Sequence, residues 1–267
     1  MDGRLADAAA VRAPLLPAQA RLAALGEVPR GNTQRHVNRD LLAWLTRQPA
    51  LSTPGLRWLD APCGAGELLG CLRQVFPESQ LFGMDRAVEP PPGLSTTHYR
   101  AADLSQPSAF AAGASFDVIT SVSGVMMFGN TRTFIESCAR QLRPGGLFIV
   151  SNDNVLTVRD RLSYFWLGRV RRFKLLFETD EGMSQLVQQQ ELKRLLEIQS
   201  LTVREVVYTA FYREDWLFLP LALLIFPVQW LYLRRLRHST PPALRQQLFG
   251  WRSLLGRHYF MVAEKKS

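Results

Sequence analysis

The chain has 267 residues, of which 47% are hydrophobic and 21% are charged. This composition is ordinary for a globular protein, and the length suffices for one large α/β domain or two small ones. The three cysteines are too few and too scattered for a disulfide framework or a zinc site, which favours a reducing compartment and predicts no metal. Charged residues interrupt the Ala-rich N-terminus, which argues against a secretory signal peptide.

Helical and extended segments are expected to alternate along the chain. In order, the patterns predict a helix at 38–48, a strand at 56–61, a helix at 67–76, strands at 79–85, 97–104 and 116–123, a helix at 131–142, a strand at 147–153, a helix at 188–199, and strands at 201–209 and 257–265. This alternation predicts a parallel sheet with helices on both faces. Ligands in such sheets bind at the carboxyl ends of the strands, so candidate chemistry is sought there.

A glycine-bearing turn follows the first predicted strand, which ends in Asp60. Gly64 and Gly66 allow the backbone to turn sharply and to approach a ligand closely. A helix begins just beyond them, and its free N–H groups favour ligand oxygens. Leu69 stands where a dinucleotide fingerprint requires a third glycine, and no Gly-Lys-Ser/Thr follows. The turn therefore does not indicate NAD or a phosphate-binding P-loop.

Three acids occupy three successive strand ends. Asp85 ends the second strand, where an acid can bind two ribose hydroxyls. Asp103 ends the third, where a carboxylate can accept from an adenine amino group. Each acid alone is readily read as a turn or helix-cap residue. Together with Asp60 and the glycine turn, they indicate a nucleoside site.

Five motifs, LDAPCGAGELL, LFGMDRA, AADL, FDVITSVSG and LRPGGLFIVSNDN, resemble in order and spacing those of class I S-adenosylmethionine-dependent methyltransferases. The resemblance implies an α/β fold: a seven-stranded, Rossmann-like, doubly wound sheet whose antiparallel last strand lies between the fifth and sixth. The expected domains are an N-terminal helical cap at 1–50 and a cofactor-binding domain at 51–210 plus 257–267. The apolar and basic pattern of the chain itself predicts a helical insertion at 211–256.

The implied cofactor is S-adenosylmethionine, with S-adenosylhomocysteine as the product. By resemblance, Asp60 orients the glycine loop beneath the methionine part, Asp85 binds the ribose hydroxyls, and Asp103 with the amide of Leu104 reads the adenine. Val122 and Ser123 would line the sulfonium side. The expected cofactor contacts are Asp60, Cys63, Gly64, Ala65, Gly66, Asp85, Arg86, Asp103, Leu104, Val122 and Ser123.

The sequence departs from the family pattern in two places. Pro62 replaces the first glycine of the first motif, which leaves the turn intact but stiffens it. Many relatives carry a Glu and a His just after the fourth strand, and residues 123–128 contain neither, so no role is transferred to them.

Two residues are candidate bases for a hydroxyl or phenol acceptor, whose methylation benefits from proton removal. His36 precedes the first strand and is favoured, because N-terminal helices cover the cofactor in related enzymes. Asp153 follows the fifth strand. His36 is equally consistent with a helix-surface residue and Asp153 with a loop or helix-cap residue.

The net charge of +9 is concentrated locally. Residues 216–263 contain six arginines and no Asp or Glu, and 159–174 form a second basic run rich in aromatics. Basic residues interleaved with aromatic ones favour an anionic membrane surface. A solvated basic face is the alternative for the run at 159–174.

Residues 216–233 are uncharged and nominally long enough to cross a bilayer. A single crossing is excluded if 257–265 completes the sheet, because that strand would then lie on the wrong side. Pro220 and Pro227 are expected to divide the segment into two short pieces, or one kinked piece, lying in the membrane interface. A second helix is expected between Thr240 as its cap and Gly256 at its end. A substrate lid or a dimer interface is the alternative.

Together these features predict a methyltransferase peripheral to the cytoplasmic face of the inner membrane. Its expected reaction is O-methylation of an amphipathic or lipid-linked acceptor, such as a lipid, an isoprenoid quinone, a polyene or a lipid-linked glycan. No nucleic-acid partner is expected, because the segment after the fourth strand lacks the Asn/Asp-Pro-Pro-aromatic sequence of amino-methylating enzymes. Two alternatives are a soluble methyltransferase for a metabolite or sugar, with 211–256 as a lid, and a non-catalytic binding protein of the same fold.

Overall fold

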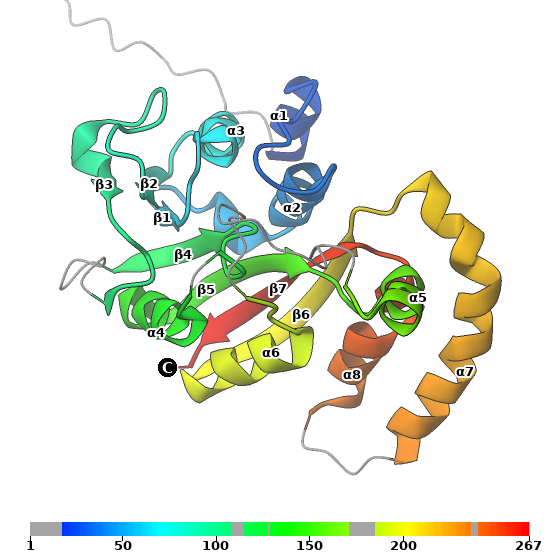
Figure 1. Ribbon diagram of the computed structural model, residues 1–267. Coiled ribbons are helices and arrows are strands. Elements are labelled where there is room, and N and C mark those ends of the chain that lie inside the picture. Colours follow the sequence, from blue (N-terminus) through cyan, green and yellow to red (C-terminus); the bar gives the residue numbers. More distant parts are fainter. Residues whose placement is uncertain (1–17, 108–114, 128, 171–184, 236–239, 267) are drawn as a thin grey trace, which may run out of the picture.

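The computed structural model describes residues 18–107, 115–127, 129–170, 185–235 and 240–266. These residues include a seven-stranded sheet of order β3-β2-β1-β4-β5-β7-β6 (Figure 1). Its strands are β1 Arg57–Asp60, β2 Gln80–Asp85, β3 Tyr99–Ala101, β4 Phe116–Ser121, β5 Leu142–Asp153, β6 Leu201–Thr209 and β7 His258–Lys265. The first five are parallel, and β7 is antiparallel to both β5 and β6. The predicted sheet and the position of its last strand are confirmed.

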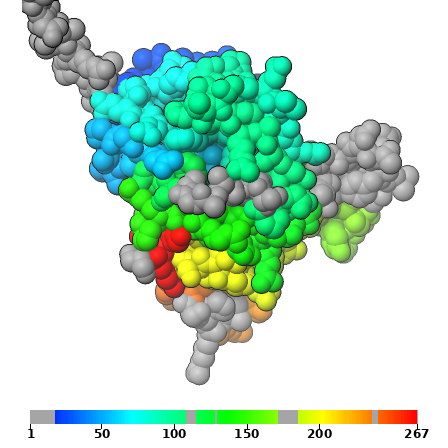
Figure 2. All heavy atoms as spheres, turned by 90° about the vertical axis from the view of Figure 1, so that its left-hand side faces the viewer, coloured from blue at the N-terminus to red at the C-terminus, as the bar shows by residue number. Residues whose placement is uncertain are grey.

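Helices cover both faces of this sheet because successive strand residues are apolar on both sides. Trp58, Val118 and Ile149 pack against one set of helices, α1 Ala18–Ala24, α2 Val37–Leu45 and α3 Glu67–Val75. The alternate face packs against α4 Thr131–Gln141, α6 Gln189–Ile198 and α8 Pro242–Phe249. Figure 2, seen from the left of Figure 1, shows the blue-to-teal N-terminal half stacked on the green-to-orange half. Short 3₁₀ turns lie at Pro49–Ser52 (η1), Thr96–His98 (η2), Arg213–Phe218 (η4) and Trp251–Leu254 (η5).

Two predicted strands differ from the structure at their ends. β3 stops at Ala101, so Asp103 lies two residues beyond the strand. β5 begins at Leu142, so the Arg-Pro-Gly-Gly sequence expected to precede it lies inside. The pairing of β4 with β5 shifts register between Phe116 and Val118, which accommodates these extra residues as an irregularity at the start of the strand.

The first helix of the insertion is α7, Leu219–Arg235, which has 17 residues. Two short pieces, or one kinked piece, were expected here. Pro220 is the second residue of this helix, a position where the missing N–H is not needed. Only Pro227 lies inside it. The expectation that Pro227 divides the segment into two pieces was therefore wrong, whereas the change from η4 to α7 occurs next to Pro220.

The second helix of the insertion is also bounded differently from the prediction. Pro241, not Thr240, is the residue before the first turn of α8, and the helix ends at Phe249 with Gly250 as its C-cap. Gly256 lies beyond the following η5 turn. Leu244 and Leu248 of α8 are buried, whereas Trp251, which follows the helix, is exposed.

Together η4 and α7, Arg213–Arg235, form a helical segment that is long and apolar enough to cross a membrane by length and composition. One of its ends continues from β6 and the other leads through α8 to β7, which pairs with β6. Both ends therefore return to one sheet. The helix packs on the domain through Ala222, against Val158 and Leu254.

Two Leu-to-Ala substitutions test this division between core and exposed apolar surface. Leu42 of α2 is 0% exposed, whereas Leu223 of α7 is 62% exposed. Leu42→Ala should lower the free energy of unfolding by about 2–5 kcal/mol, through lost burial and the cavity left behind. Leu223→Ala should change it by less than about 0.5 kcal/mol. Urea unfolding measures both, and an equally large loss for Leu223→Ala would contradict the exposed position of α7.

Candidate functional site

A cavity of about 530 Å³ lies at the carboxyl ends of β1, β2 and β4. This volume is within the range of small-molecule sites. Its lining comprises Arg30, Gly31, Asn32, Thr33, Asn38, Asp60, Pro62, Cys63, Gly64, Glu67, Leu68, Asp85, Arg86, Asp103, Leu104, Ser105, Val122, Ser123, Met127 and Gly129. The wall thus combines the strand ends of the sheet with a segment from the N-terminal cap.

The glycine turn is held by the carboxylate of Asp85. The backbone N–H of Gly64 donates to Asp85 Oδ2 at 2.8 Å, and the N–H of Arg86 donates to Oδ1 at 2.7 Å. Gly64 and Gly66 have φ values of +53° and +83°, a region that favours glycine. A Cβ added at Gly66 would lie 2.6 Å from Pro91 Cβ. Larger residues therefore do not fit at this position.

Asp60 is a buried acid on the cavity floor. Burial raises the pKa of Asp60 to about 7, and the nearby charges of Asp85 and Glu67 add to the rise. The Thr120 hydroxyl, which donates to Asp60 Oδ1 at 2.7 Å, partly opposes it. One buried and two half-buried carboxylates close together favour a ligand that brings positive charge.

Asp103 has a different environment, since its side chain is exposed at the rim. Asp103 Oδ1 accepts from the hydroxyl of Ser105 at 2.8 Å and from its backbone N–H at 3.0 Å. These two hydrogen bonds lower the pKa of Asp103, so this carboxylate is ionised and acts as an acceptor at neutral pH. Leu104 beside it is buried.

The N-terminal segment, which was expected to cover the cofactor, supplies one wall of the cavity through residues that the sequence did not single out. The amide nitrogen of Asn38 donates to the carbonyl oxygens of Pro29 and Arg30 at 3.0 and 3.2 Å. Among the described residues, Asn38 Oδ1 is buried without a hydrogen-bond partner. Arg30 Nε donates to the carbonyl oxygen of Thr33 at 2.5 Å, which folds the segment over the cavity. No local motif marks these residues, because they reach the site only through the packing of α2.

Most of the expected cofactor contacts converge on the cavity. Asp60, Cys63, Gly64, Asp85, Arg86, Asp103, Leu104, Val122 and Ser123 all line it. Ala65 and Gly66 belong to the turn but not to the lining.

The two candidate bases lie elsewhere. His36 is exposed at the N-cap of α2, with φ +72°, and does not line the cavity. Asp153 is buried behind the cavity wall.

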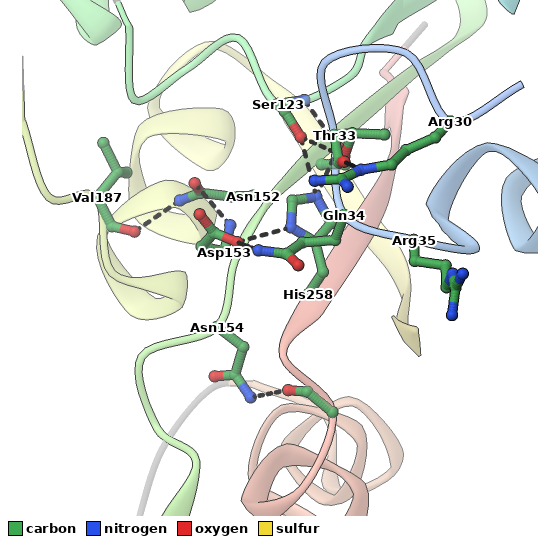
Figure 3. A network of polar contacts seen from close by, with 12 residues as sticks. Arg30, Thr33, Gln34, Arg35, Ser123, Asn152, Asp153, Asn154, Val187 and His258 are labelled. Atoms are coloured by element: carbon green, nitrogen blue, oxygen red, sulfur yellow. Dashed lines mark hydrogen bonds and ion pairs between the residues drawn. The ribbon is translucent and has the colours of Figure 1, made fainter. Parts of the chain in front are cut away.

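Asp153 belongs to a buried polar network that the sequence did not reveal (Figure 3). Its Oδ1 lies 3.1 Å from Nδ1 of His258, and Gln34 Nε2 donates to the same oxygen at 3.4 Å. His258 Nε2 lies 3.0 Å from Ser151 Oγ and 3.4 Å from Ser123 Oγ. The network ends at Ser123, which lines the cavity. His258 follows an apolar insertion in the sequence, so only the pairing of β7 with β5 reveals its position.

The side chains present fit the methyl donor that the motifs imply. S-adenosylmethionine carries a sulfonium and an ammonium, and the cavity offers the clustered acids and the unpaired Asn38 Oδ1 as acceptors for positive groups. The glycine turn leaves room for close approach of a ligand to the backbone. Over the described part of the chain, no group of three or more His, Cys, Asp or Glu side chains is placed to hold a metal ion.

Replacing Asp60 by Asn tests the electrostatics of this floor. Because the folded pKa of Asp60 lies above its unfolded value of 3.8, the folded state holds a proton that the unfolded state releases between about pH 4 and pH 7. Wild-type stability should therefore fall relative to Asp60→Asn across this window, by about 1.4 kcal/mol per pH unit, and level off above it. Urea unfolding of the ligand-free proteins at several pH values measures this. A difference that does not vary with pH would contradict the raised pKa.

Comparison with known proteins assigns the family. A sequence model of the methyltransferase domain family matches residues 33–206. The ubiquinone biosynthesis O-methyltransferase of Sinorhizobium fredii is 29% identical over 170 residues, which are 60% of this chain and 66% of that enzyme. The protein of the same name from Agrobacterium fabrum is 31% identical over 159 residues, 55% of this chain and 61% of that protein. The match thus spans just under two thirds of these relatives.

The fold comparison agrees with the sequence. A crystal structure of an S-adenosylmethionine-dependent methyltransferase from Archaeoglobus fulgidus superimposes with a TM-score of 0.52. It covers 85% of this chain and 94% of its own, at 15% identity, which establishes likeness of fold alone. The chain belongs to the methyltransferase domain family, within the superfamily of class I S-adenosylmethionine-dependent methyltransferases.

Proposed function

We propose that this chain transfers a methyl group from S-adenosylmethionine to a phenolic oxygen of a quinone-like acceptor that carries an apolar tail. The observation that carries the proposal is the convergence of the cofactor motifs on one cavity, in a chain whose curated relatives are named ubiquinone biosynthesis O-methyltransferases. We further propose that the reaction takes place at the cytoplasmic face of an anionic membrane.

Each cofactor residue has a role that its own chemistry supports. S-adenosylmethionine supplies a methyl group already activated on a positively charged sulfur. Asp85 holds the glycine turn and accepts from the ribose hydroxyls, and ionised Asp103 at the rim accepts from the adenine side. Asp60, Glu67 and Asn38 Oδ1 complement the positive groups of the methionine part.

The acceptor would enter between the loop after β4 and the N-terminal segment. Val122 and Met127 give this part of the cavity an apolar wall, which suits an aromatic ring. Thr33 and Ser123 place hydroxyl groups beside it. Aligning the reacting oxygen in a site that excludes water can contribute about 7–11 kcal/mol to such a reaction, so positioning is the main task of this wall.

The membrane part of the proposal rests on two apolar surfaces at one edge of the sheet. Because β6 and β5 are both antiparallel to β7, they run in the same direction as β1 and β4. The carboxyl ends of β5 and β6 therefore lie at the edge that holds the cavity. Helix α5, Val158–Leu167, follows β5, and η4 with α7 follows β6. Both helical segments therefore begin at the edge of the sheet where an acceptor would enter.

These two helices expose large apolar side chains. The exposed residues are Tyr164, Phe165, Trp166 and Leu167 on α5, and Leu217, Leu223, Leu224, Val228, Leu231 and Tyr232 on η4 and α7. At the end of α7, the guanidinium of Arg234 stacks on the ring of Trp230 at 4.2 Å. Exposed apolar groups beside arginines suit the interface of an anionic membrane. A lid that packs on its own domain would bury these side chains instead.

Methyl transfer can be tested with isotope-labelled S-adenosylmethionine and two acceptors: a dihydroxybenzene with a short isoprenoid tail, and the same ring without it. We expect a labelled methyl ether, formed faster on the tailed ring because the tail adds apolar contact.

Asp85→Ala should weaken S-adenosylhomocysteine binding by about 10–100-fold, since hydrogen bonds to charged groups contribute about 1.5–3 kcal/mol. Calorimetry measures the binding, and Glu78→Ala, an exposed acid outside the cavity, is the matched control.

Two outcomes would redirect the proposal. Transfer to a water-soluble sugar or metabolite, without transfer to either phenol, would favour the soluble enzyme with residues 211–256 as a lid. Binding of S-adenosylhomocysteine without product from any acceptor class would favour a binding protein of this fold.

Membrane docking can be tested by flotation with vesicles of phosphatidylglycerol and phosphatidylcholine. The wild-type protein should float, and a triple variant Leu223→Ser, Leu224→Ser, Val228→Ser should not, because the apolar face of α7 is lost. The control is Ile198→Ser, an apolar residue on α6 with 54% exposure and no place in either surface. Flotation of the triple variant equal to that of wild type, or failure of the wild type to float, would contradict docking through α7.

A further inference from the structure

A continuous set of hydrogen-bonding side chains connects the cavity to a buried carboxylate (Figure 3). It begins at the wall, where Thr33 Oγ1 and Ser123 Oγ lie 2.6 Å apart. It continues from Ser123 and Ser151 to His258 Nε2 and ends where His258 Nδ1 faces Asp153 Oδ1. The members come from the N-terminal segment, the loop after β4, β5 and β7, so they are brought together only by the tertiary fold.

The hydrogen-bond partners of His258 suit one tautomer of a neutral imidazole. A carboxylate of Asp153 accepts, so in that tautomer Nδ1 carries the hydrogen and Nε2 is the acceptor. Ser151 Oγ accepts from the backbone N–H of Ser123 at 2.9 Å, and Ser151 and Ser123 both direct their hydroxyl oxygens toward Nε2. The imidazole therefore presents an unprotonated nitrogen toward the two serines on the cavity side.

Burial distinguishes the roles of the members. His258 is 0% exposed and does not line the cavity, so it cannot touch an acceptor directly. Ser123 does line it and lies between the cavity and the imidazole. Ser123 also has a φ of +54°, an uncommon conformation for a residue other than glycine. Such conformations are retained where the surrounding structure fixes them, often at functional sites.

Within the described part of the chain, charged groups near His258 come from β5, α2 and the insertion. Asp153 of β5 faces the ring, and Gln34 of the N-terminal segment is a neutral partner of that carboxylate. On β6, Thr209 pairs with His258 and donates to the carboxylate of Asp40 on α2. The neighbouring Arg257 directs its guanidinium to Asp215 and Glu214.

We propose that Ser123, His258 and Asp153 form a proton relay for the phenolic acceptor, an inference that rests on the methyl transfer proposed above. As the acceptor oxygen forms its bond to the methyl carbon, the bond from that carbon to the sulfonium sulfur breaks and leaves its electron pair on the sulfur. The O–H bond of the acceptor breaks as well, and its proton passes to Ser123 Oγ. The hydroxyl proton of Ser123 passes to His258 Nε2, and Asp153 stabilises the imidazolium. After product release the same steps in reverse return the proton to solvent. Ser123 contacts the acceptor, and His258 and Asp153 act through it.

Two variants break the relay at different points without removing the fold's apolar contacts. Ser123→Gly removes the hydroxyl and suits the positive φ. His258→Gln keeps hydrogen-bonding capacity but has no basic nitrogen. Ser200→Gly is the matched control, because Ser200 also has a positive φ, +60°, and lies outside the cavity lining.

The test measures kcat, KM and S-adenosylhomocysteine binding between pH 6 and pH 10 with the tailed dihydroxybenzene. Each relay variant should lower kcat at pH 7 by about 10²–10³-fold, the range of positioned proton transfer. KM and S-adenosylhomocysteine binding should stay within about 3-fold of wild type, since S-adenosylhomocysteine lacks the sulfonium charge that Ser123 would face and proton transfer is needed only in the transition state. The loss should shrink toward pH 10, where a phenol with a pKa near 10 ionises by itself.

The double variant is expected to lose no more than either single one, because the residues act as a unit. Full kcat in Ser123→Gly would overturn the relay while leaving the proposed function standing. Losses that add in the double variant, or that do not depend on pH, would assign these residues a structural role only. Absence of methyl transfer by the wild-type protein would overturn the proposed function and the relay with it. If His258→Gln fails to fold, the kcat and pH profile of Ser123→Gly decide the question.

Discussion

The antiparallel pairing of β7 with β5 is the constraint on which the rest of this molecule depends. Seven residue pairs, from Leu147 opposite Glu264 to Asp153 opposite His258, hold the C-terminal strand in the sheet. This pairing returns the chain to the sheet after the insertion. The chain on both sides of α7 therefore connects to strands of the same sheet. The same register places His258 against Asp153. One strand pairing thus fixes both the topology of the apolar insertion and the polar network behind the cavity.

The insertion and the cavity are also connected by side chains. Tyr212, at the base of the insertion, donates its hydroxyl to Gln34 and accepts from the backbone N–H of Arg35. Arg257 stacks on the Tyr212 ring at 4.2 Å and pairs with Asp215 of η4, the turn that precedes α7. The N-terminal segment that closes the cavity is therefore attached to the segment proposed to meet the membrane. Docking of α7 would act on the acceptor side of the cavity through these contacts.

The cofactor half of the site could be predicted from the sequence because its signals are local. Asp60, Asp85 and Asp103 follow apolar runs, and parallel strands bring their carboxyl ends to one edge. Glycines at 64 and 66 adopt the positive φ that a sharp turn requires. None of these features depends on a contact distant in the chain.

The acceptor half could not be predicted, because it depends on long-range packing. Thr33 and Asn38 reach the cavity through the seating of α2 on the sheet, and His258 reaches the network through strand register. Local rules also failed in the insertion, where Pro227 was expected to divide a helix that continues through it. The prediction of His36 as a base relied on the position of the cap, and the structure leaves that side chain exposed, outside the cavity lining.

The most direct test of the central claim is a crystal structure of the protein with S-adenosylhomocysteine. The account predicts the nucleoside in the cavity at the carboxyl ends of β1, β2 and β4, with both ribose hydroxyls on Asp85 and the adenine beside Asp103. Electron density for the ligand at another place on the molecule, or a ribose that makes no contact with Asp85, would contradict it.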